Sequence, residues 1–339
     1  MKAALFLEVG KPLRVAEVAR PDAGPGGLVF KVKACGICGS DLHAVEVPGL
    51  LQAGNVLGHE YAGEVVEVGP GATGWKVGDR LIALPGRPCG TCAACQTGRF
   101  AACGQFIMQG FDMRMPGAYA EYSSCLASLA TKIPDELTDQ DAAMVEPLAV
   151  GLHAWKAASA TPGASVLIVG AGIIGLAVAK WAKFFGAGDI GVSEKVPARI
   201  ERAKAVGVEL VLDAGQHADP VVEYERRTGR PPSVIFECVG RPMLTELIAM
   251  APREVHLVLV GTGMQPDSFT VVSAALKQLR MSFPLGYAPD DFPFVQRMLV
   301  AGRVTVDGLV TATVSLDEVP AMFERLGKPN DHCKVLITP

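Results

Sequence analysis

The stretch Val166-Leu-Ile-Val-Gly-Ala-Gly-Ile-Ile-Gly175 decides the fold of this chain. Its first residues, 166–169, form an apolar run that is typical of a buried strand. Residues 173–185 then have the length and the apolar spacing of a helix. Glycines stand at 170, 172 and 175, where the two elements join. A strand, a glycine-rich turn and a helix in this order predict the opening unit of a doubly wound α/β domain.

The three glycines have different physical roles in such a turn. Gly170 makes the tight turn, Gly172 lets a pyrophosphate approach the backbone, and Gly175 lets the helix pack closely on the strand. The first helical residues, Ile173 and Ile174, would offer amide donors and the positive end of the helix dipole to phosphates. The motif therefore predicts a bound dinucleotide, and a glycine-rich turn without a ligand is the plainer alternative.

An acidic residue, Glu194, ends the next predicted strand, nineteen residues past Gly175. A carboxylate at this place accepts hydrogen bonds from the adenosine ribose and repels a 2′-phosphate, which favours NAD over NADP. Lys195 and Arg199 act in the opposite direction, because cations tolerate that phosphate. An ordinary solvated acid is the alternative interpretation of Glu194.

Strand-like and helix-like segments alternate beyond the motif. Apolar runs recur at 190–193, 209–212, 234–236, 256–260 and 281–284, with helix-like segments such as 197–206 and 243–250 between them. Steps of roughly 20–25 residues are the rhythm of a parallel sheet with helical crossovers. Together with 166–169 they make six strands, as in a dinucleotide-binding domain.

The chain before the motif is of a different kind. Runs at 28–34 and 63–68 are apolar and β-branched with charges interleaved, and glycine- and proline-containing turns separate them, which predicts a β-rich domain shaped as a distorted barrel. After residue 285 we expect helices at 291–301 and 316–326 and a strand at 333–337, which return to that domain. The predicted domains are therefore 1–151, 152–284 and the return segment 285–339.

Length and composition exclude several classes of protein. The 339 residues suit two domains at about 100–200 residues each, and with 50% hydrophobic residues a large interior is feasible. A net charge of −4 without clustered basic residues argues against nucleic-acid or anionic-membrane partners. No apolar stretch reaches ~18 residues and no signal peptide is visible, so we expect a cytoplasmic protein without a membrane span.

Four cysteines lie within a short lobe, residues 89–103: Cys89, Cys92, Cys95 and Cys103. Two-residue gaps let sulfurs converge on one ion, and four thiolates suit a structural Zn²⁺ at roughly 2.3 Å per sulfur. Disulfides or free thiols are the alternatives. Disulfides across such gaps would be strained, and nine cysteines without a secretion signal favour a reducing compartment.

A second set of metal-binding residues is spread along the first domain: Cys38, His59, Glu60 and Glu146. A thiolate, a neutral imidazole and one carboxylate, from either Glu60 or Glu146, would leave one zinc position open, as in a catalytic site. Taken singly, each residue is as well explained as a buried thiol or a satisfied polar group. Their combination beside a predicted dinucleotide domain indicates a catalytic zinc.

These motifs together resemble the zinc-containing medium-chain alcohol dehydrogenases over nearly the whole chain. The matching segments are Cys35-Gly-Ile-Cys38-Gly-Ser40-Asp41, Gly58-His59-Glu60, the four-cysteine lobe, Val145-Glu146-Pro147 and the glycine motif with Glu194. Glu146-Pro147 and the Gly-Ser after Cys38 look most like the polyol, butanediol and threonine dehydrogenase branch, since the liver-type branch has a cysteine in place of Glu146. The resemblance implies an α/β protein in which a GroES-like β-rich catalytic domain is joined to a Rossmann domain.

The resemblance also implies roles for individual residues. Cys38, His59 and Glu146 would hold the catalytic zinc, Glu146 directly or through water, with Glu60 close behind or exchanging as a ligand. Ser40 would hydrogen-bond the substrate oxygen, and His43 would be the outer end of a proton relay. The segments near the cofactor would be Val260, Gly261 and Thr262 at the nicotinamide and Cys238 with Val239 near the adenosine half.

The implied reaction is hydride transfer between a secondary alcohol or vicinal diol and NAD, giving a ketone, with two zinc ions per chain. L-threonine or a polyol is the alternative substrate in this family. A zinc-free enone reductase would lack the ligand set, and a non-catalytic NAD-binding zinc protein would not need Ser40 and His43. Phe106, Ile107, Met108 and Phe111 favour an apolar substrate, unless they are ordinary core. An apolar edge strand at 280–284 predicts a homodimer, and the branch resemblance a tetramer.

Overall fold

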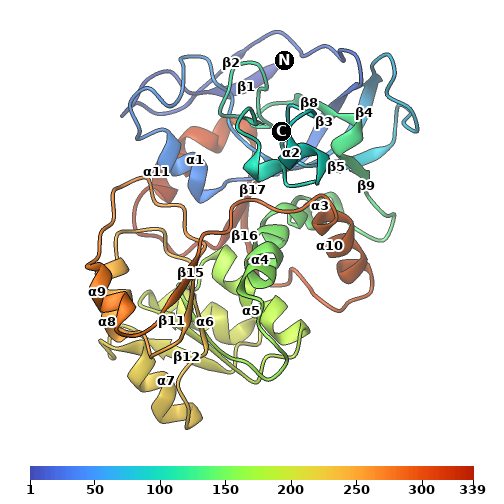
Figure 1. Cartoon of the computed structure of the whole chain (residues 1–339). Helices are drawn as coiled ribbons and strands as arrows, with labels where there is room; N and C mark the ends of the chain where they lie inside the picture. Colours follow the sequence, from blue (N-terminus) through green and yellow to red (C-terminus); the bar gives the residue numbers. More distant parts are fainter. The chain divides into compact units, whose positions relative to one another are not determined.

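The computed structural model describes all 339 residues of the chain. The chain divides into two compact units (Figure 1). The first consists of Met1–Glu146, Ala288–Gly302 and Val310–Pro339, and the second of Pro147–Tyr287 with Arg303–Leu309. Both ends of the chain therefore belong to the first unit.

The second unit contains a six-stranded sheet in which every neighbouring pair is parallel. Its strands are, in order across the sheet, β12 (Leu210–Asp213), β11 (Asp189–Glu194), β10 (Ser165–Val169), β13 (Val234–Glu237), β14 (His256–Leu259) and β15 (Arg280–Ser282). All six strands that the apolar runs predicted are present, and the α/β fold class is confirmed. The parallel order arises because each strand is followed by a crossover segment that carries a helix.

Helices cover both faces of this sheet, which is why all five residues of β10 are buried. On one face, Leu167 and Val169 share a core with α7 (Pro220–Thr228) and α8 (Leu244–Met250). On the other face, Phe236 stacks on Trp155 with ring centroids 6.1 Å apart. The remaining helices of this unit are α4 (Val145–Ala158), which begins at the boundary with the first unit, α5 (Ile173–Phe184), α6 (Pro197–Ala205) and α9 (Val271–Ala275).

Helix α4 was not predicted from the sequence. It carries Pro147 in its first turn and Gly151 in its middle, and most of its residues are buried, so that only the side with His153 and Lys156 is partly open to solvent. Gly151 lets α4 pack closely on α5, because a Cβ there would lie 2.6 Å from the Cβ of Ala177. Trp181 of α5 donates from Nε1 to the carbonyl of Leu148 at 2.8 Å. Figure 1 shows the two helices side by side.

The strand order creates a reversal point in the sheet. The chain proceeds from β10 outward through β11 and β12, and then returns to place β13 on the other side of β10. At such a point the loops that follow the two central strands diverge and leave a crevice at the carboxyl edge of the sheet. The glycine turn after β10 and the turn after β13 are therefore the two segments that flank this crevice.

The first unit is built around a seven-stranded sheet in the order β16-β17-β3-β4-β5-β9, with β8 paired to β3 as well. These strands are β3 (Gly27–Gly36), β4 (Glu60–Val68), β5 (Arg80–Ala83), β8 (Tyr122–Leu126), β9 (Ala130–Lys132), β16 (Val310–Val314) and β17 (Lys334–Ile337). Two small sheets pair β1 (Lys2–Leu5) with β2 (Arg14–Glu17), and β6 (Gly86–Arg87) with β7 (Ile107–Met108).

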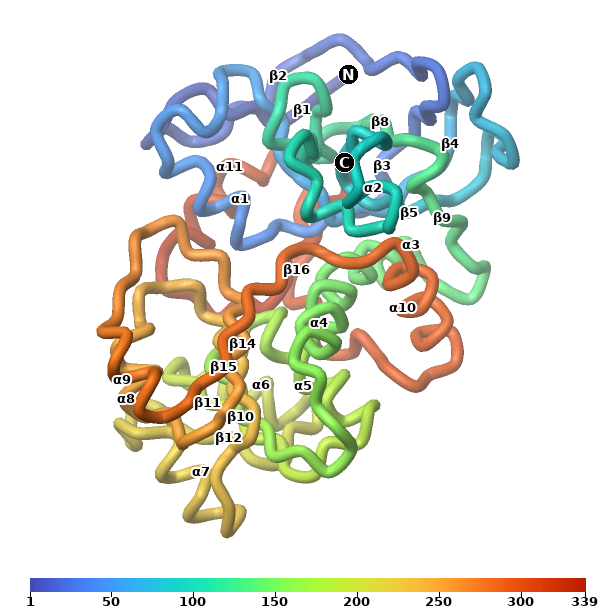
Figure 2. Tube along the Cα trace, viewed as in Figure 1, coloured from blue at the N-terminus to red at the C-terminus, as the bar shows by residue number.

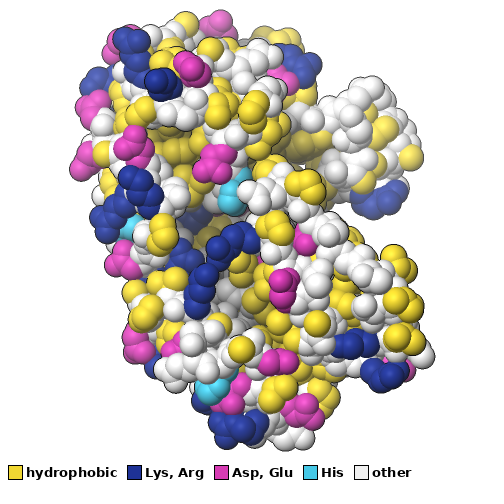
Figure 3. All heavy atoms as spheres, turned by 90° about the vertical axis from the view of Figure 1, so that its left-hand side faces the viewer, with side chains coloured by type: hydrophobic (Ala, Val, Ile, Leu, Met, Phe, Trp, Pro, Cys, Tyr) yellow, Lys and Arg dark blue, Asp and Glu magenta, His cyan; other side chains and the backbone are white.

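The helices of the first unit are short. They are α1 (Gly39–Ala44), α2 (Ala93–Gln96), α3 (Asp139–Ala143), α10 (Asp291–Val300) and α11 (Val319–Leu326), with single 3₁₀ turns at Phe100–Ala102, Ala127–Leu129 and Leu316–Glu318. None of the helices in either unit has both the length and the apolar character that a membrane crossing requires. Figure 3 shows acidic and basic side chains interspersed on the face in view, in keeping with the net charge of −4.

The C-terminal strand brings distant parts of the first unit together. In the register of the sheet, Gly36 of β3 stands opposite Glu60 of β4 on one side and Leu336 of β17 on the other. Figure 2 shows the last segment of the chain, in red, running among the blue and cyan segments of this unit. The ends of β3, β4 and β17 therefore meet at one place, although they lie far apart in the sequence.

Candidate functional site

The ends of β3 and β4 bring three of the predicted metal ligands together. Cys38 follows β3 and caps α1, while His59 directly precedes Glu60, the first residue of β4. The ligand atoms of Cys38, His59 and Glu60 all lie within 4.8 Å of one another. Glu146, in the first turn of α4, is buried but is not part of this group. Cysteine, histidine and glutamate ligands in this arrangement suit a zinc ion that retains an open position.

The imidazole of His59 is oriented by a buried carboxylate. Its Nδ1 lies 3.3 Å from Oδ1 of Asp41, and its Nε2 lies 3.5 Å from Oγ of Ser40. Asp41 is held in turn by the Tyr119 hydroxyl, 2.6 Å from Oδ2, and by the amide of Cys38. A carboxylate behind a histidine fixes the tautomer of a metal ligand, so Nε2 is the nitrogen that faces the metal position.

The electrostatics of this pair favour a positive charge on or beside the ring. Burial by itself would lower the pKa of His59, but Asp41 and Cys38 raise that pKa well above its usual value. Burial likewise opposes ionisation of Asp41, yet His59 and Tyr119 lower the pKa of its carboxyl. In the free protein a proton can supply this charge, and a divalent ion at Nε2 would supply it instead.

Glu60 is paired with a lysine that the sequence analysis did not single out. Lys334 Nζ lies 2.6 Å from each Glu60 carboxylate oxygen and donates to the carbonyl of Ile37 at 2.9 Å. Both side chains are about 1% exposed. Burial opposes the charge on Lys334, but Glu60 foremost, then Cys38 and more weakly Glu146, raise its pKa above the ordinary value. Gly36 makes room for this pair, because a Cβ at that position would overlap the Glu60 carboxylate.

The two predicted relay residues lie on α1. Ser40 Oγ donates to Cys38 Sγ at 3.2 Å and so lies beside two of the three clustered ligands. His43 is half-buried in the last turn of the same helix, three residues further on. Residues three apart share one side of a helix, so the structure places Ser40 and His43 on a common side of α1.

An aromatic ring closes one side of the cluster. The Phe111 ring lies against the His59 imidazole with centroids 6.0 Å apart. Its loop is anchored by the fully buried Gln109, which accepts from the Tyr61 hydroxyl at 2.8 Å and donates to Ser123 Oγ at 3.0 Å. Because Tyr61 follows His59 and Glu60 directly, this network ties the apolar wall to the strand that carries the ligands.

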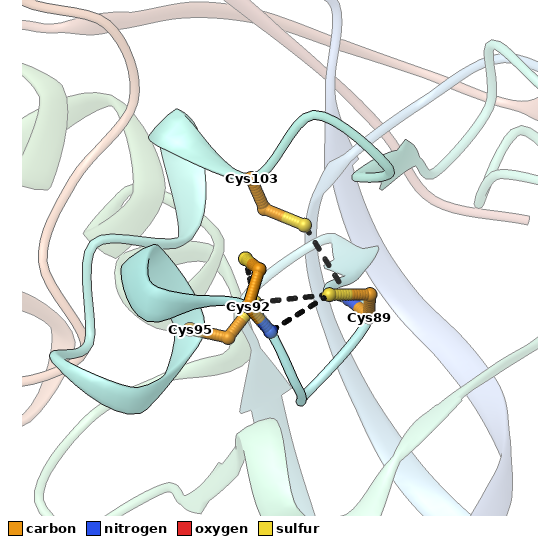
Figure 4. Close-up of side chains that lie close together, drawn as sticks. All are labelled: Cys89, Cys92, Cys95 and Cys103. Atoms are coloured by element: carbon orange, nitrogen blue, oxygen red, sulfur yellow. Dashed lines mark hydrogen bonds between the residues drawn. The ribbon is translucent and has the colours of Figure 1, made fainter.

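The four-cysteine lobe has the dimensions of a zinc site. Cys95 Sγ lies 3.8 Å from Cys89 Sγ and 3.5 Å from Cys92 Sγ, and a tetrahedron with arms of roughly 2.3 Å has edges of ~3.8 Å. Figure 4 shows these side chains and Cys103 with their sulfurs close together. Backbone amides of Thr91 and Cys92 lower the pKa of Cys89 to about 6, whereas burial raises that of Cys95 to about 12. A metal must therefore displace the Cys95 proton.

In the second unit, the glycine turn has the geometry that its three roles require. Gly170 has φ of +101°, and a Cβ there would lie 2.9 Å from Cγ2 of Val239. A Cβ on Gly175 would overlap the carbonyl of Gly170, whereas Gly172 faces open space and caps α5. No side chain caps this helix, so the amides of its first turn, including Ile173 and Ile174, remain suited to an anion.

Glu194 holds the glycine turn as well as ending β11. Its Oε2 accepts from the amide of Ala171 at 3.0 Å, and its Oε1 accepts from the amides of Lys195 at 2.7 Å and Val196 at 2.9 Å. A carboxylate has about four acceptor sites, so about one remains for a ribose hydroxyl. Lys195 is exposed and Arg199 is half-buried at the start of α6.

The other predicted cofactor segments follow the next two strands. Cys238 and Val239 come directly after β13, and Val260, Gly261 and Thr262 come after β14. The two turns pack closely, because a Cβ on Gly240 would lie 3.4 Å from the Cα of Gly261. The structure therefore brings all the segments that the sequence predicted for the cofactor to the carboxyl edge of the sheet.

Comparisons with known proteins identify the family of this chain. Residues 24–135 match the model of the alcohol dehydrogenase GroES-like domain, and residues 174–301 match that of the zinc-binding dehydrogenases. Sorbitol dehydrogenase of Bacillus subtilis is 33% identical over 100% of this chain and 97% of its own length. (R,R)-butanediol dehydrogenase of the same organism is 33% identical over 97% of each protein. The chain belongs to the zinc-containing medium-chain alcohol dehydrogenase family.

Solved structures show the same relationship for this dehydrogenase. The crystal structure of 2R,3R-butanediol dehydrogenase from Bacillus subtilis superposes with a TM-score of 0.88 at 32% identity, covering 100% of this chain and 99% of the other. A Sinorhizobium meliloti zinc-binding dehydrogenase with a TM-score of 0.88, 29% identical over 100% and 99%, was solved with NADP. An Escherichia coli alcohol dehydrogenase with a TM-score of 0.89, 28% identical over 100% and 99%, was solved with NADH. Structures of relatives of this dehydrogenase thus contain either dinucleotide.

The dehydrogenase therefore has a four-cysteine structural site and a cysteine, histidine and glutamate site for catalysis, and it acts on alcohols with NAD or NADP. The supporting residues Asp41, Tyr119 and Lys334 were missed by the sequence analysis. Asp41 carried a local signal, since it lies within the Cys-Gly-Ser-Asp motif. Nothing in the sequence marks Lys334 or Tyr119, because their partners are distant along the chain.

Proposed function

We propose that this dehydrogenase interconverts a secondary alcohol or vicinal diol and the corresponding ketone, using NAD. The observation that carries the proposal is the position of the Ser40 hydroxyl, 3.2 Å from Cys38 Sγ and 3.5 Å from His59 Nε2. A hydroxyl beside two metal ligands can take the proton of an alcohol that binds at the open position. This placement favours catalysis over a purely structural zinc or a binding role.

The residues of the chain divide the work of the reaction. When bound, zinc supplies Lewis acidity at the alcohol oxygen and the nicotinamide ring accepts the hydride. Cys38 and His59 hold the metal position, with Glu60 or Glu146 as the carboxylate, Glu146 directly or through water. Ser40 takes the hydroxyl proton and passes it outward in the direction of His43. Asp41 orients His59, and Lys334 balances the buried charge of Glu60.

The cofactor we propose is NAD rather than NADP. About one acceptor site of Glu194 remains for a ribose hydroxyl, and its charge would repel a 2′-phosphate. Lys195 and Arg199 reduce this discrimination, so we expect a preference and not an absolute requirement. The pyrophosphate would lie against Gly172 and the first turn of α5, with the segments after β13 and β14 along the rest of the cofactor.

For the substrate, we propose a short secondary alcohol or vicinal diol with an apolar substituent. Two relatives, each 33% identical, are named for sorbitol and for (R,R)-butanediol, so identity does not choose between a polyol and a small diol. The Phe111 ring against His59 favours the diol, because a hydrocarbon substituent gains by contact with it whereas a polyol would leave hydroxyls unpaired. The polyol remains the second candidate.

We also propose that the protein is a homodimer formed through the edge strand β15, with a tetramer as the larger alternative. Two apolar side chains are exposed in the segment that directly follows this strand, Phe283 at 69% and Leu285 at 60%. An apolar, unpaired strand edge is a surface that associates readily. The functional domains we propose are 1–151, 152–284 and 285–339, with the lobe 89–103 binding structural zinc.

The test is a substrate and cofactor screen with zinc-loaded protein, followed by absorbance at 340 nm. We expect kcat/KM for 2,3-butanediol to exceed that for sorbitol by about 10-fold or more, and NAD⁺ to be preferred to NADP⁺. Phe111→Ser should reduce the ratio of kcat/KM for the diol to kcat/KM for the polyol. Met113→Ser, which alters an exposed residue of the same loop, should leave this ratio unchanged. A preference for sorbitol in the unaltered protein would contradict the diol assignment.

A further inference from the structure

Glu237, the last residue of β13, is a buried carboxylate without an ion pair. It is 4% exposed, and its Oε1 accepts from the amides of Val239 at 2.6 Å and Gly240 at 2.9 Å. Its backbone carbonyl accepts from the amides of Val260 and Gly261. Its Oε2 faces Gly261, where a Cβ would lie 2.7 Å away. Glu237 thus contacts both the turn after β13 and the turn after β14.

The turn that Glu237 holds lies directly against the glycine turn. Val239 Cγ2 and the carbonyl of Cys238 occupy the space where a side chain at Gly170 would be. Because β10 and β13 flank the reversal point of the sheet, these two turns form the two sides of the crevice expected to receive a dinucleotide. A change in the shape of the turn after β13 would therefore displace one wall of that crevice.

Glu194 and Glu237 are arranged alike on the two sides of β10. Each is the last residue of a strand that neighbours β10, each is buried, and each accepts from two amides of the turn that follows. Glu194 also accepts from Ala171 in the glycine turn. The sequence marked Glu194 by its distance from the glycines, but it contains no comparable marker for Glu237.

We propose that Glu237 is a positioning residue for the nicotinamide cofactor, which holds the turn 238–240 in the shape that the bound dinucleotide requires. The proposal rests on the dinucleotide-binding part of the proposed function. It also explains why a carboxylate is tolerated in this interior: its charge is compensated by amide donors, which would otherwise be free to compete for the pyrophosphate with the first turn of α5. Burial raises the pKa of Glu237, while those amides act in the opposite direction.

The experiment compares Glu237→Gln and Glu237→Ala with a matched control, Glu225→Gln, which alters an exposed glutamate of α7 in the same unit. The dissociation constant of NADH would be measured by fluorescence, together with kcat, KM for NAD⁺, zinc content and Tm with and without NADH. Glutamine keeps one acceptor oxygen and the same shape, so it separates the charge from the mere presence of a side chain.

We expect Glu237→Gln to weaken NADH binding about 10-fold and Glu237→Ala about 100-fold, because hydrogen bonds to a charged group are replaced by weaker ones or lost. At saturating cofactor, kcat should stay within about 2-fold, and both zinc ions should be retained. Partial rescue by glutamine relative to alanine is part of the expected result. If the alanine variant does not fold, the isosteric glutamine variant still decides the question.

An unchanged NADH dissociation constant in Glu237→Gln, even with a lower Tm, would overturn the proposal, because Glu237 would then only stabilise the sheet edge. Equal weakening in Glu225→Gln would overturn it too, since the effect would not be specific to the turn. If the unaltered protein bound neither NADH nor NADPH, the proposed function itself would fail, and that outcome is distinguished by the first measurement of the series.

Discussion

The two metal sites of the first unit are built in different ways. The four-cysteine site takes all its ligands from fifteen consecutive residues, 89–103, around the short helix α2. The Cys38, His59 and Glu60 site draws on the ends of two strands, and Glu60 is paired with Lys334, 274 residues away. The four-cysteine site can therefore form within one short segment, whereas the Cys38, His59 and Glu60 site forms only when the strands of the sheet have paired.

The two sites also differ in the chemistry that their ligands allow. Four sulfurs saturate a tetrahedral ion, so the lobe can stabilise structure but has no position left for a substrate. The other cluster combines mixed ligands with two buried charge pairs, His59 with Asp41 and Lys334 with Glu60. We therefore expect substitutions in the lobe to affect stability first, and substitutions in the other cluster to affect the reaction first.

The largest expected effect comes from removing a ligand of the second cluster. His59→Ala should reduce kcat at least about 1,000-fold, because the metal position loses its imidazole and the Lewis acid is lost. Circular dichroism should be unchanged, and zinc content should fall from two ions per chain to one. Cys38→Ser serves as a parallel variant. Full activity with unchanged zinc would show that this cluster is not the catalytic one.

The second largest effect is expected on stability, when the buried ion pair between Lys334 and Glu60 is broken. Lys334→Met leaves the Glu60 carboxylate buried without its lysine, which should lower the free energy of unfolding of the metal-free protein by about 3–5 kcal/mol in denaturant titrations. The control is Lys33→Met, which removes a partly exposed pair with Glu64 at 2.8 Å and should cost at most about 1 kcal/mol. An equal loss in the free energy of unfolding for the two variants would contradict the prediction, because burial would then not make the Lys334 pair more important for stability.

Removing a ligand of the four-cysteine lobe should have a smaller effect, and the effect should be on Tm and not on kcat. Cys92→Ser should lower Tm by about 5 °C, or ~2 kcal/mol, because one thiolate of the tetrad is lost. One zinc ion per chain should be released, while kcat of the remaining folded enzyme should stay within about 3-fold. A collapse of kcat at unchanged Tm would reverse the division of roles between the two sites.

The smallest expected effect concerns the outer end of the relay. His43→Ala should lower kcat about 10-fold near pH 7, because the proton taken up at Ser40 loses its route to solvent. Activity should recover as the pH is raised, since hydroxide and buffer can then accept the proton. A pH–rate profile parallel to that of the unaltered enzyme would remove His43 from the relay.

The parts of the fold that were predicted correctly are those with local or periodic signals. The six strands of the second unit appear as separate apolar runs, and the glycine turn lies between a strand and a helix that are adjacent in sequence. Helix α4 was missed because most of it is buried, which leaves only a narrow polar side at His153 and Lys156 and weakens the 3.6-residue pattern. Its packing on α5 through Gly151 is a property of the assembled unit.

The sequence by itself marked the candidate residues for metal and dinucleotide, because thiolate spacing within a lobe and glycines within one turn act over a few residues. Only the tertiary structure decided how those residues are supported. Lys334, Tyr119 and Glu237 become partners of Glu60, Asp41 and the turn after β13 through strand pairing and burial. The physical reason is that a charge can be buried only where neighbouring groups compensate it. The fold determines which groups are its neighbours, and distance along the chain does not.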